Sequence, residues 1–204
     1  KAFLGARKVD SLLEAILSAG NRCATLVKQI LGFAREGTVA FEAVDVADVL
    51  RDALAFMAAD FSPDNEYDFK KFRIVREFDP NVPKVRCRPA DIQMVFLNLL
   101  KNGAQAMAAA DGAGQFTLRI SAVADSVRTE IEDTGPGISA EMQRRIFEPF
   151  FTTKPVGQGT GLGLSISYFI VVDKHGGQLL VDSVPGRGTR FVVELPVFTG
   201  ETHS

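Results

Sequence analysis

The feature that most constrains the fold is the interleaving of strand and helix patterns between residues 46 and 195. Strand patterns, rich in β-branched and aromatic residues, lie at 73–78, 115–122, 127–132, 178–184 and 189–195. Helical patterns lie at 46–59, 89–110 and 162–174, and a polar loop is expected at 61–71. Two strand pairs beside a few helices predict an α+β fold, a two-layer sandwich with helices packed on one face of a mixed sheet.

A long helix is expected at residues 9–36, ahead of this unit. Its apolar residues alternate spacings of four and three, which is a heptad pattern: Val9, Leu13, Ile16, Gly20, Cys23, Val27, Ile30 and Ala34. A second row widens the stripe: Leu12, Ala19, Leu26 and Phe33. So wide a stripe favours a helix bundle with partner helices, and the alternative is a core helix of a single domain.

Composition excludes several classes of protein. Hydrophobic residues make up 46% and charged residues 24% of the 204 residues, which is typical of a soluble globular protein. The formal net charge of −2 gives no sign of a nucleic-acid partner. No apolar run reaches the roughly 18 residues of a membrane span, so a cytoplasmic location is expected. Because the chain begins with Lys1, we expect a fragment, which leaves room for membrane or sensor parts upstream. Cys23 and Cys87 are expected to be reduced and structural.

Three amides mark the helical pattern at 89–110. At about 100° per residue, Asn98, Asn102 and Gln105 fall within a wedge of about 60° beside the apolar stripe. An amide oxygen is a hard ligand that suits a magnesium ion which also takes oxygens from phosphates. An ordinary polar helix face is the alternative, and taken alone it is the better interpretation.

One glycine-containing segment follows a strand pattern, and another opens a helix. Asp133 ends a strand and precedes Gly135 and Gly137, so its carboxylate can accept a hydrogen bond from a planar donor; an ordinary turn is the alternative. The segment 157–164 opens the last helix, where converging backbone amides can bind an anion. A flexible linker is the alternative there, and no Walker sequence follows.

The segment 146–154 lies between them and combines three phenylalanines with Thr-Thr-Lys. It predicts a lid that buries aromatic side chains when closed and offers Lys154 to a phosphate. A short core helix with a solvated lysine is the alternative.

These segments, in this order, resemble the motifs of two-component sensor histidine kinases. The N box corresponds to 96–103, the first glycine box to 133–138, the F box to 147–154 and the second glycine box to 159–164. The sequences at 175–177 and 183–189 are similar to the closing strands of the same domain. The resemblance covers residues 9–197, and 105–107 with 149–154 are most similar to the nitrogen-regulation branch.

The resemblance implies an ATP-binding α/β sandwich of the type shared with gyrase, mismatch-repair ATPases and heat-shock chaperones. It implies that Asp133 holds the adenine amine with support from Thr189. It also implies that Asn102 ligates Mg²⁺, that Asn98 assists at the phosphates and that Gln105 lies near them. The other ATP-binding residues that it implies are Gly135, Gly137, Ile138, Phe147, Thr153, Lys154, Gly159, Thr160, Gly161, Leu162, Gly163 and Leu164.

The resemblance also implies an organisation and partners. Residues 1–37 would be the second helix of a dimerisation and histidine-phosphotransfer hairpin, 38–45 a linker, 46–198 the ATP-binding domain and 199–204 a tail. The implied activity is transfer of the γ-phosphoryl group of Mg-ATP to a histidine of the kinase's own dimerisation helix, for relay to a response-regulator aspartate. A homodimer is implied for the full-length protein, with any membrane attachment through other parts.

Two departures from the pattern bear on activity. Gly103 stands where alanine is usual, which costs about 1 kcal/mol of helix propensity but should leave binding intact. The phosphoacceptor motif, a histidine followed by an acid in a helix, is absent. His175 and His203 both lie outside the 9–36 helix, and we interpret both as non-catalytic.

Two other functions remain as alternatives. A gyrase- or chaperone-type ATPase would need a glutamate one helical turn before the magnesium-binding asparagine, and Asn98 occupies that place. An amide cannot take a proton from water, so hydrolysis would lack its base. The third possibility is a nucleotide-binding interaction module without transfer, against which the intact motifs argue.

Overall fold

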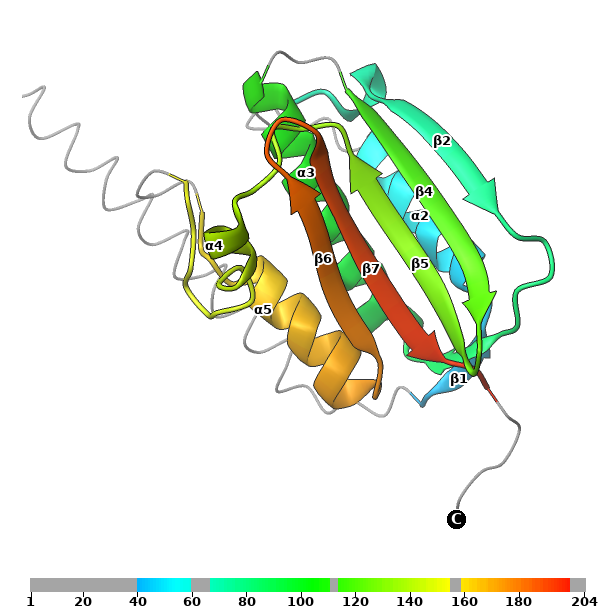
Figure 1. Ribbon diagram of the computed structural model, residues 1–204. Coiled ribbons are helices and arrows are strands. Elements are labelled where there is room, and N and C mark those ends of the chain that lie inside the picture. The colour runs from blue at the N-terminus through cyan, green and yellow to red at the C-terminus, as the bar shows by residue number, and fades with distance from the viewer. Residues whose placement is uncertain (1–39, 60–66, 111–113, 155–158, 199–204) are drawn as a thin grey trace, which may run out of the picture.

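The computed structural model describes residues 40–59, 67–110, 114–154 and 159–198, and these form a sandwich of one sheet and one helical layer. The order of the five-stranded sheet is β2-β4-β5-β7-β6 (Figure 1). The strands are β2 Arg73–Phe78, β4 Gln115–Val123, β5 Ser126–Asp133, β6 Gln178–Val184 and β7 Gly188–Pro196. β2 runs parallel to β4 and the other neighbours are antiparallel, which confirms the predicted mixed sheet and α+β fold.

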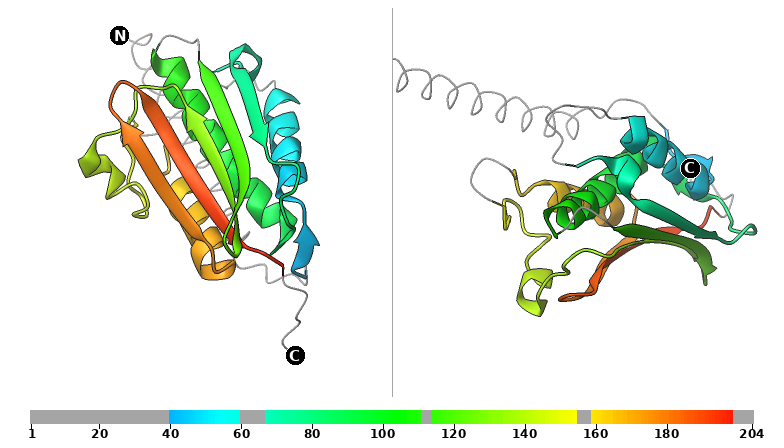
Figure 2. Two further views of the ribbon diagram at one scale, coloured as in Figure 1. Left: turned by 45° about the vertical axis from the view of Figure 1, so that its right-hand side comes forward. Right: turned by 90° about the horizontal axis from the view of Figure 1, so that it is seen from above.

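The helices gather on one face of the sheet, as the view from above shows (Figure 2). They are α2 Val46–Ala59, α3 Pro89–Ala110 and α5 Gly163–Tyr168, which continues as the π-helix η2 Phe169–Lys174. The predicted bounds 46–59 and 89–110 are confirmed because strong apolar periodicity defines both helices. The helix predicted at 162–174 is confirmed as one helical stretch, but its second half has π geometry.

The hydrophobic core lies between the sheet and the helices, because alternate side chains along each strand point to the helical side. On β4, Phe116, Leu118 and Ile120 point to the helices and are at most 2% exposed. They meet the apolar stripe of α3, whose fully buried members include Phe96 and Leu100. α3 is therefore fixed along one face, and its amide-bearing edge keeps a defined position beside the end of β5.

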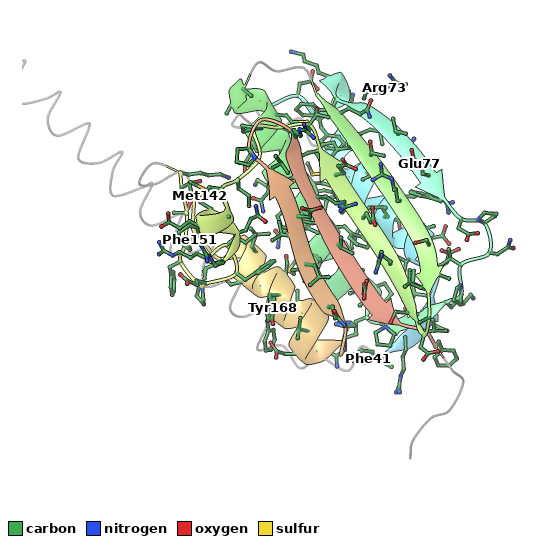
Figure 3. All side chains as sticks on the ribbon, viewed as in Figure 1. Phe41, Arg73, Glu77, Met142, Phe151 and Tyr168 are labelled. Atoms are coloured by element: carbon green, nitrogen blue, oxygen red, sulfur yellow. The ribbon has the colours of Figure 1, made fainter. Side chains whose placement is uncertain are left out.

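The opposite face of the sheet carries ion pairs. Arg119 on β4 bonds Glu77 on β2 at 2.7 Å and Glu132 on β5 at 2.5 Å. Glu77 is labelled in Figure 3. Arg190 on β7 continues the row with Asp182 on β6 at 2.6 Å. Charged side chains on a sheet face indicate a solvated surface, so the candidate site belongs to the side of the helices.

The structure corrects two predicted loops. The expected linker at 38–45 contains strand β1, Glu42–Val44, which pairs antiparallel with β3, Val85–Cys87. The expected loop at 61–71 ends in a 3₁₀ helix, η1 Phe69–Lys71. Asp68 caps η1 by accepting a hydrogen bond from the Lys70 amide at 3.1 Å. Each of these elements spans three residues, which is too short for a periodic pattern to predict.

The other predictions about domain organisation fall partly outside the described residues. The bundle helix expected at 9–36, the tail at 199–204 and His203 all lie outside them. Among the helices in the described ranges, none combines the length and apolar character that crossing a bilayer requires. Cys87 is a buried free thiol whose pKa is raised by burial to about 12, in accord with a reduced structural residue.

Candidate functional site

A buried carboxylate stands at the end of β5. Asp133 is 5% exposed, and its Oδ1 accepts hydrogen bonds from the backbone amides of Gly135 at 2.8 Å and Thr189 at 3.3 Å. Burial raises the pKa of Asp133, and these two hydrogen bonds oppose that rise. Its Oδ2 lies toward α3, 3.1 Å from where Gly103 would carry a Cβ. Asp133 therefore keeps one oxygen for the protein backbone and directs the other toward the helix that bears the amides.

Thr189, which the resemblance assigns to the support of Asp133, makes two separate polar contacts at this site. Its backbone amide supports Asp133, while its hydroxyl lies 3.1 Å from Ser183 Oγ. Ser183 also accepts a hydrogen bond from the Ile138 amide at 2.9 Å and donates to the Gly188 carbonyl at 2.7 Å. Sequence reasoning noted Ser183 only as part of a motif and assigned it no role at the site. It connects the predicted first glycine box to the hairpin of β6 and β7.

The glycine turn after Asp133 packs backbone against backbone. Gly137 has a φ of +69°, and a Cβ there would lie 2.3 Å from the Val184 carbonyl oxygen. Gln143 on helix α4, Ala140–Gln143, adds hydrogen bonds to the carbonyls of Ile138 at 3.1 Å and Ser183 at 2.8 Å. The predicted turn is thus a rigid corner, and only glycine suits its conformation at residue 137.

The three amides of α3 have different partners. Asn98 Nδ2 donates to the Gly163 carbonyl and to Ser167 Oγ, at 3.3 Å each. Gln105 Oε1 accepts a hydrogen bond from Lys154 Nζ. Asn102 is half-buried between them, and no hydrogen bond within the described part of the chain occupies its side chain. The amide wedge thus joins α5 at one end and the predicted lid at the other, with Asn102 available in the middle.

The aromatic residues of the predicted lid have separate environments. Phe147 packs against Tyr168 of α5, with ring centroids 5.4 Å apart and the ring planes tilted by 42°. Tyr168 is labelled in Figure 3. The guanidinium of Arg145 lies 4.4 Å from the Phe151 ring. Phe150 is 70% exposed and has a φ of +66°. Helix α4, Ala140–Gln143, precedes this segment, and closure of the lid over a nucleotide stays a prediction.

A backbone hydrogen bond joins the predicted lid to the segment that opens α5. The Phe150 amide donates to the Gly161 carbonyl at 2.9 Å. Gly161 has a φ of +65°, and a Cβ there would lie 2.4 Å from the Phe150 carbonyl carbon. This contact brings the predicted F box and second glycine box together, because only glycine allows the two backbones to approach so closely.

The other residues predicted to bind ATP near this contact differ in their burial and in their contacts. A Cβ on Gly159 would lie 2.7 Å from Thr152 Oγ1, while the Thr160 hydroxyl accepts from the Leu162 amide at 3.3 Å. Leu162 is buried and Leu164 is half-buried. Thr153 is exposed and makes no polar contact among the described residues, so the structure does not bring it together with the other predicted site residues.

The donor atoms at the site fit one kind of metal ion. In the described ranges, no three His, Cys, Asp or Glu side chains come together as a metal site. The oxygens near the lid and glycine turns come instead from the amides of Asn98, Asn102 and Gln105. Such a set is too small to hold a resident ion, but it suits Mg²⁺ that arrives with phosphate oxygens and water.

Both ring nitrogens of His175 make hydrogen bonds within the protein. The residue is buried, its Nδ1 donates to the Ile170 carbonyl at 2.7 Å, and its Nε2 accepts from the Arg88 amide at 3.1 Å. Burial lowers its pKa, so the ring is neutral at pH 7. Its ring also contacts Phe41 at a centroid distance of 4.9 Å. This arrangement agrees with the non-catalytic interpretation and adds Arg88 and Phe41, which the sequence did not indicate.

Comparisons with known proteins agree with this architecture. Sensor kinase CckA of Brucella abortus is 39% identical over 86% of this chain and 19% of its own length. Sensory histidine kinase/phosphatase NtrB of Escherichia coli is 32% identical over 92% of this chain and 53% of its own length. The chain thus spans about a fifth to a half of these relatives. A similarity to NtrB beside a higher identity to CckA leaves the nitrogen-regulation branch a prediction.

Solved structures show the same fold. The catalytic domain of histidine kinase ThkA matches with a TM-score of 0.64 and 28% identity, covering 77% of this chain and 95% of that one. Full-length ShkA in complex with AMPPNP matches with a TM-score of 0.72 and 27% identity, covering 94% of this chain and 39% of that one. Residues 87–199 match the family model described as histidine kinase-, DNA gyrase B-, and HSP90-like ATPase. The chain therefore belongs to the histidine kinase-, DNA gyrase B- and HSP90-like ATPase family.

Proposed function

We propose that this chain is the catalytic region of a two-component sensor histidine kinase. It binds Mg-ATP and transfers the γ-phosphoryl group to a histidine on a dimerisation helix, for relay to a response-regulator aspartate. The names of its relatives support this activity, as do a similar structure with AMPPNP and another with a response regulator. A homodimer, with residues 1–37 as part of the dimerisation hairpin, belongs to the same proposal.

The observation that carries the proposal is the environment of Asp133. Its carboxylate is almost fully buried, with Oδ1 tied to two backbone amides and Oδ2 toward α3. A rigid, acceptor-only group in such a place selects a ligand with a planar N–H donor, as the exocyclic amine of adenine provides. Asp133 would thus fix the base and thereby place the phosphates toward the amides and Lys154.

The other residues position and neutralise the phosphates. Mg²⁺, when bound, would offset the charge of the transferred phosphoryl group. The free amide of Asn102 would hold that ion, since its oxygen is the kind of ligand Mg²⁺ prefers. Lys154 reaches α3 from the lid through Gln105, so its ammonium stands where it can approach a phosphate when the lid moves.

Hydrolysis as the main activity fits the geometry less well. The residue at the place of the ATPase glutamate is Asn98, whose Nδ2 is bonded to Gly163 and Ser167 of α5. An amide held in this way cannot remove a proton from water. A binding module without transfer would show the same nucleotide affinity, and only an assay with an acceptor histidine distinguishes it.

The adenine assignment is tested by replacing Asp133 with asparagine. Loss of a matched acceptor for an amine costs about 1–3 kcal/mol, so ATP affinity should fall about 5- to 150-fold. Fold stability should change less, because an asparagine Oδ1 can still accept from Gly135 and Thr189. Titration calorimetry with an ATP analogue measures the affinity, and urea denaturation measures the stability.

The matched control is Asp125→Asn in the exposed turn at the opposite end of β5. It removes the same charge far from the site and should leave ATP affinity unchanged. Near-wild-type affinity of the Asp133 variant would remove the basis of the adenine assignment.

A further inference from the structure

Ser167 on α5 is a polar side chain that the expected ATP-binding motifs do not include. It is fully buried, at 0% exposure, and its Oγ donates to the Gly163 carbonyl at 2.9 Å. A serine hydroxyl has one proton, and a carbonyl oxygen can only accept. Because that proton is used on Gly163, Oγ offers only lone pairs to its remaining neighbour.

That neighbour is the amide of Asn98. The amide lies 3.3 Å from both Ser167 Oγ and the Gly163 carbonyl oxygen, and both of these atoms are acceptors. The end of the amide that faces them must therefore be Nδ2, since a flipped amide would place its oxygen against a carbonyl oxygen. The two Nδ2 protons have two acceptors on α5, and Oδ1 is left as the group that Asn98 can present elsewhere.

Oδ1 borders the second glycine box. It lies 3.9 Å from where Gly163 would carry a Cβ, at the first residue of α5. An oxygen here can accept a hydrogen bond or approach a cation, but it repels a phosphate oxygen. The expectation that Asn98 assists at the phosphates is thereby narrowed, because its Nδ2 group is already bonded to α5 and cannot donate to a phosphate oxygen.

We propose that Ser167 is a positioning residue which fixes the amide of Asn98 so that its oxygen, not its NH₂ group, faces the nucleotide site. This inference rests on the proposed function for its ligand. Asn98 then serves Mg²⁺ or water bound to it and makes no direct hydrogen bond to phosphate oxygens. Ser167 touches no ligand and acts only through Asn98.

The pairing is tested first in the protein without nucleotide. In ¹⁵N–¹H spectra, Ser167→Ala should shift the side-chain NH₂ signals of Asn98, identified by their loss in Asn98→Ala, and speed their exchange with water. The matched control is Ser165→Ala, since Ser165 Oγ donates to the Leu162 carbonyl at 3.0 Å in the same helix, whereas the hydrogen bonds of Asn98 go to Gly163 and Ser167. Unchanged Asn98 signals in Ser167→Ala, or equal shifts in both variants, would overturn the pairing.

The consequence for the ligand is tested by a double-mutant cycle. Titrations with AMPPNP, with and without Mg²⁺, would compare wild type, Ser167→Ala, Asn98→Ala and the double variant. Ser167→Ala should weaken the magnesium-dependent affinity about five- to tenfold, and it should have no further effect when Asn98 is already alanine. Additive effects, or a loss of equal size without Mg²⁺, would contradict a role through Asn98.

The two proposals can fail separately. If the wild-type protein binds neither ATP nor AMPPNP, the proposed function is wrong, and the inference that Asn98 serves a magnesium nucleotide is wrong with it. The spectra still decide whether Ser167 fixes the amide. If the wild type binds Mg-AMPPNP and the cycle is additive, the proposed function stands and Ser167 is not a positioning residue.

Discussion

Replacing Gly103 by alanine separates helix propensity from packing at the candidate site. On propensity alone, alanine should stabilise α3 by about 1 kcal/mol. The structure predicts the opposite sign, because a Cβ at this position would lie 2.7 Å from Cε1 and 3.0 Å from Cζ of Phe116. Gly103, which departs from the usual alanine, thus makes room for a large residue on β4.

The magnitude follows from how little the Phe116 ring can move. It is fully buried, and its centroid lies 5.7 Å from that of Phe69 and 6.0 Å from that of Phe72. Overpacking of this kind costs about 1–3 kcal/mol, so after the gain in propensity the net loss is about 0–2 kcal/mol. The same Cβ would lie 3.1 Å from Asp133 Oδ2, so ATP affinity should also fall.

Urea denaturation of four proteins measures this effect: wild type, Gly103→Ala, Phe116→Leu and the double variant. In the Phe116→Leu background the ring atoms are gone, so Gly103→Ala should become neutral or stabilising by up to about 1 kcal/mol. Stabilisation by Gly103→Ala in the wild-type background would refute the packing argument. So would an equal effect of the substitution in both backgrounds.

Further predictions concern metal and pH. Asn102→Ala should remove the magnesium-dependent part of ATP affinity without destabilising α3; equal magnesium dependence in calorimetry would indicate only an exposed polar face. Because burial lowers the pKa of His175 in the folded state, stability should fall as pH drops below about 6.5, by at most about 1.4 kcal/mol per pH unit. Urea denaturation between pH 5 and 7.5 should show this slope reduced in His175→Gln, and an equal slope would contradict the assignment. The raised pKa of Asp133 acts in the opposite direction, since stability from this group falls as pH rises above about 3.8.

The larger elements could be predicted because their apolar patterns are long. The bounds of 46–59, 89–110 and 73–78 agree with α2, α3 and β2. The strands β1 and β3 could not be predicted, since three residues carry no period and their pairing depends on chain segments far apart. The π geometry after Tyr168 could not be predicted either, because six residues show the same apolar spacing in an α-helix and in a π-helix.

The candidate site, like the fold, could be predicted only in part. The order of the motifs indicated which segments meet, but the partner of each atom depends on strand register and packing. Asp133 is opposite Thr189 in the pairing of β5 with β7, which places a backbone amide, and not the threonine hydroxyl, on the carboxylate. The role of Ser183, the contact between Lys154 and Gln105, and the space that Gly103 leaves for Phe116 all depend on such tertiary positions.

Phosphoryl transfer to a separate acceptor tests the central claim most directly. The chain would be incubated with radiolabelled Mg-ATP, alone and with a helical hairpin that carries a histidine followed by an acidic residue. The account predicts acid-labile label on the hairpin and none on the chain alone, because His175 is buried with both ring nitrogens bonded. ATP binding without label on the hairpin would contradict the account. So would acid-labile label on the chain alone that disappears in His175→Ala or His203→Ala.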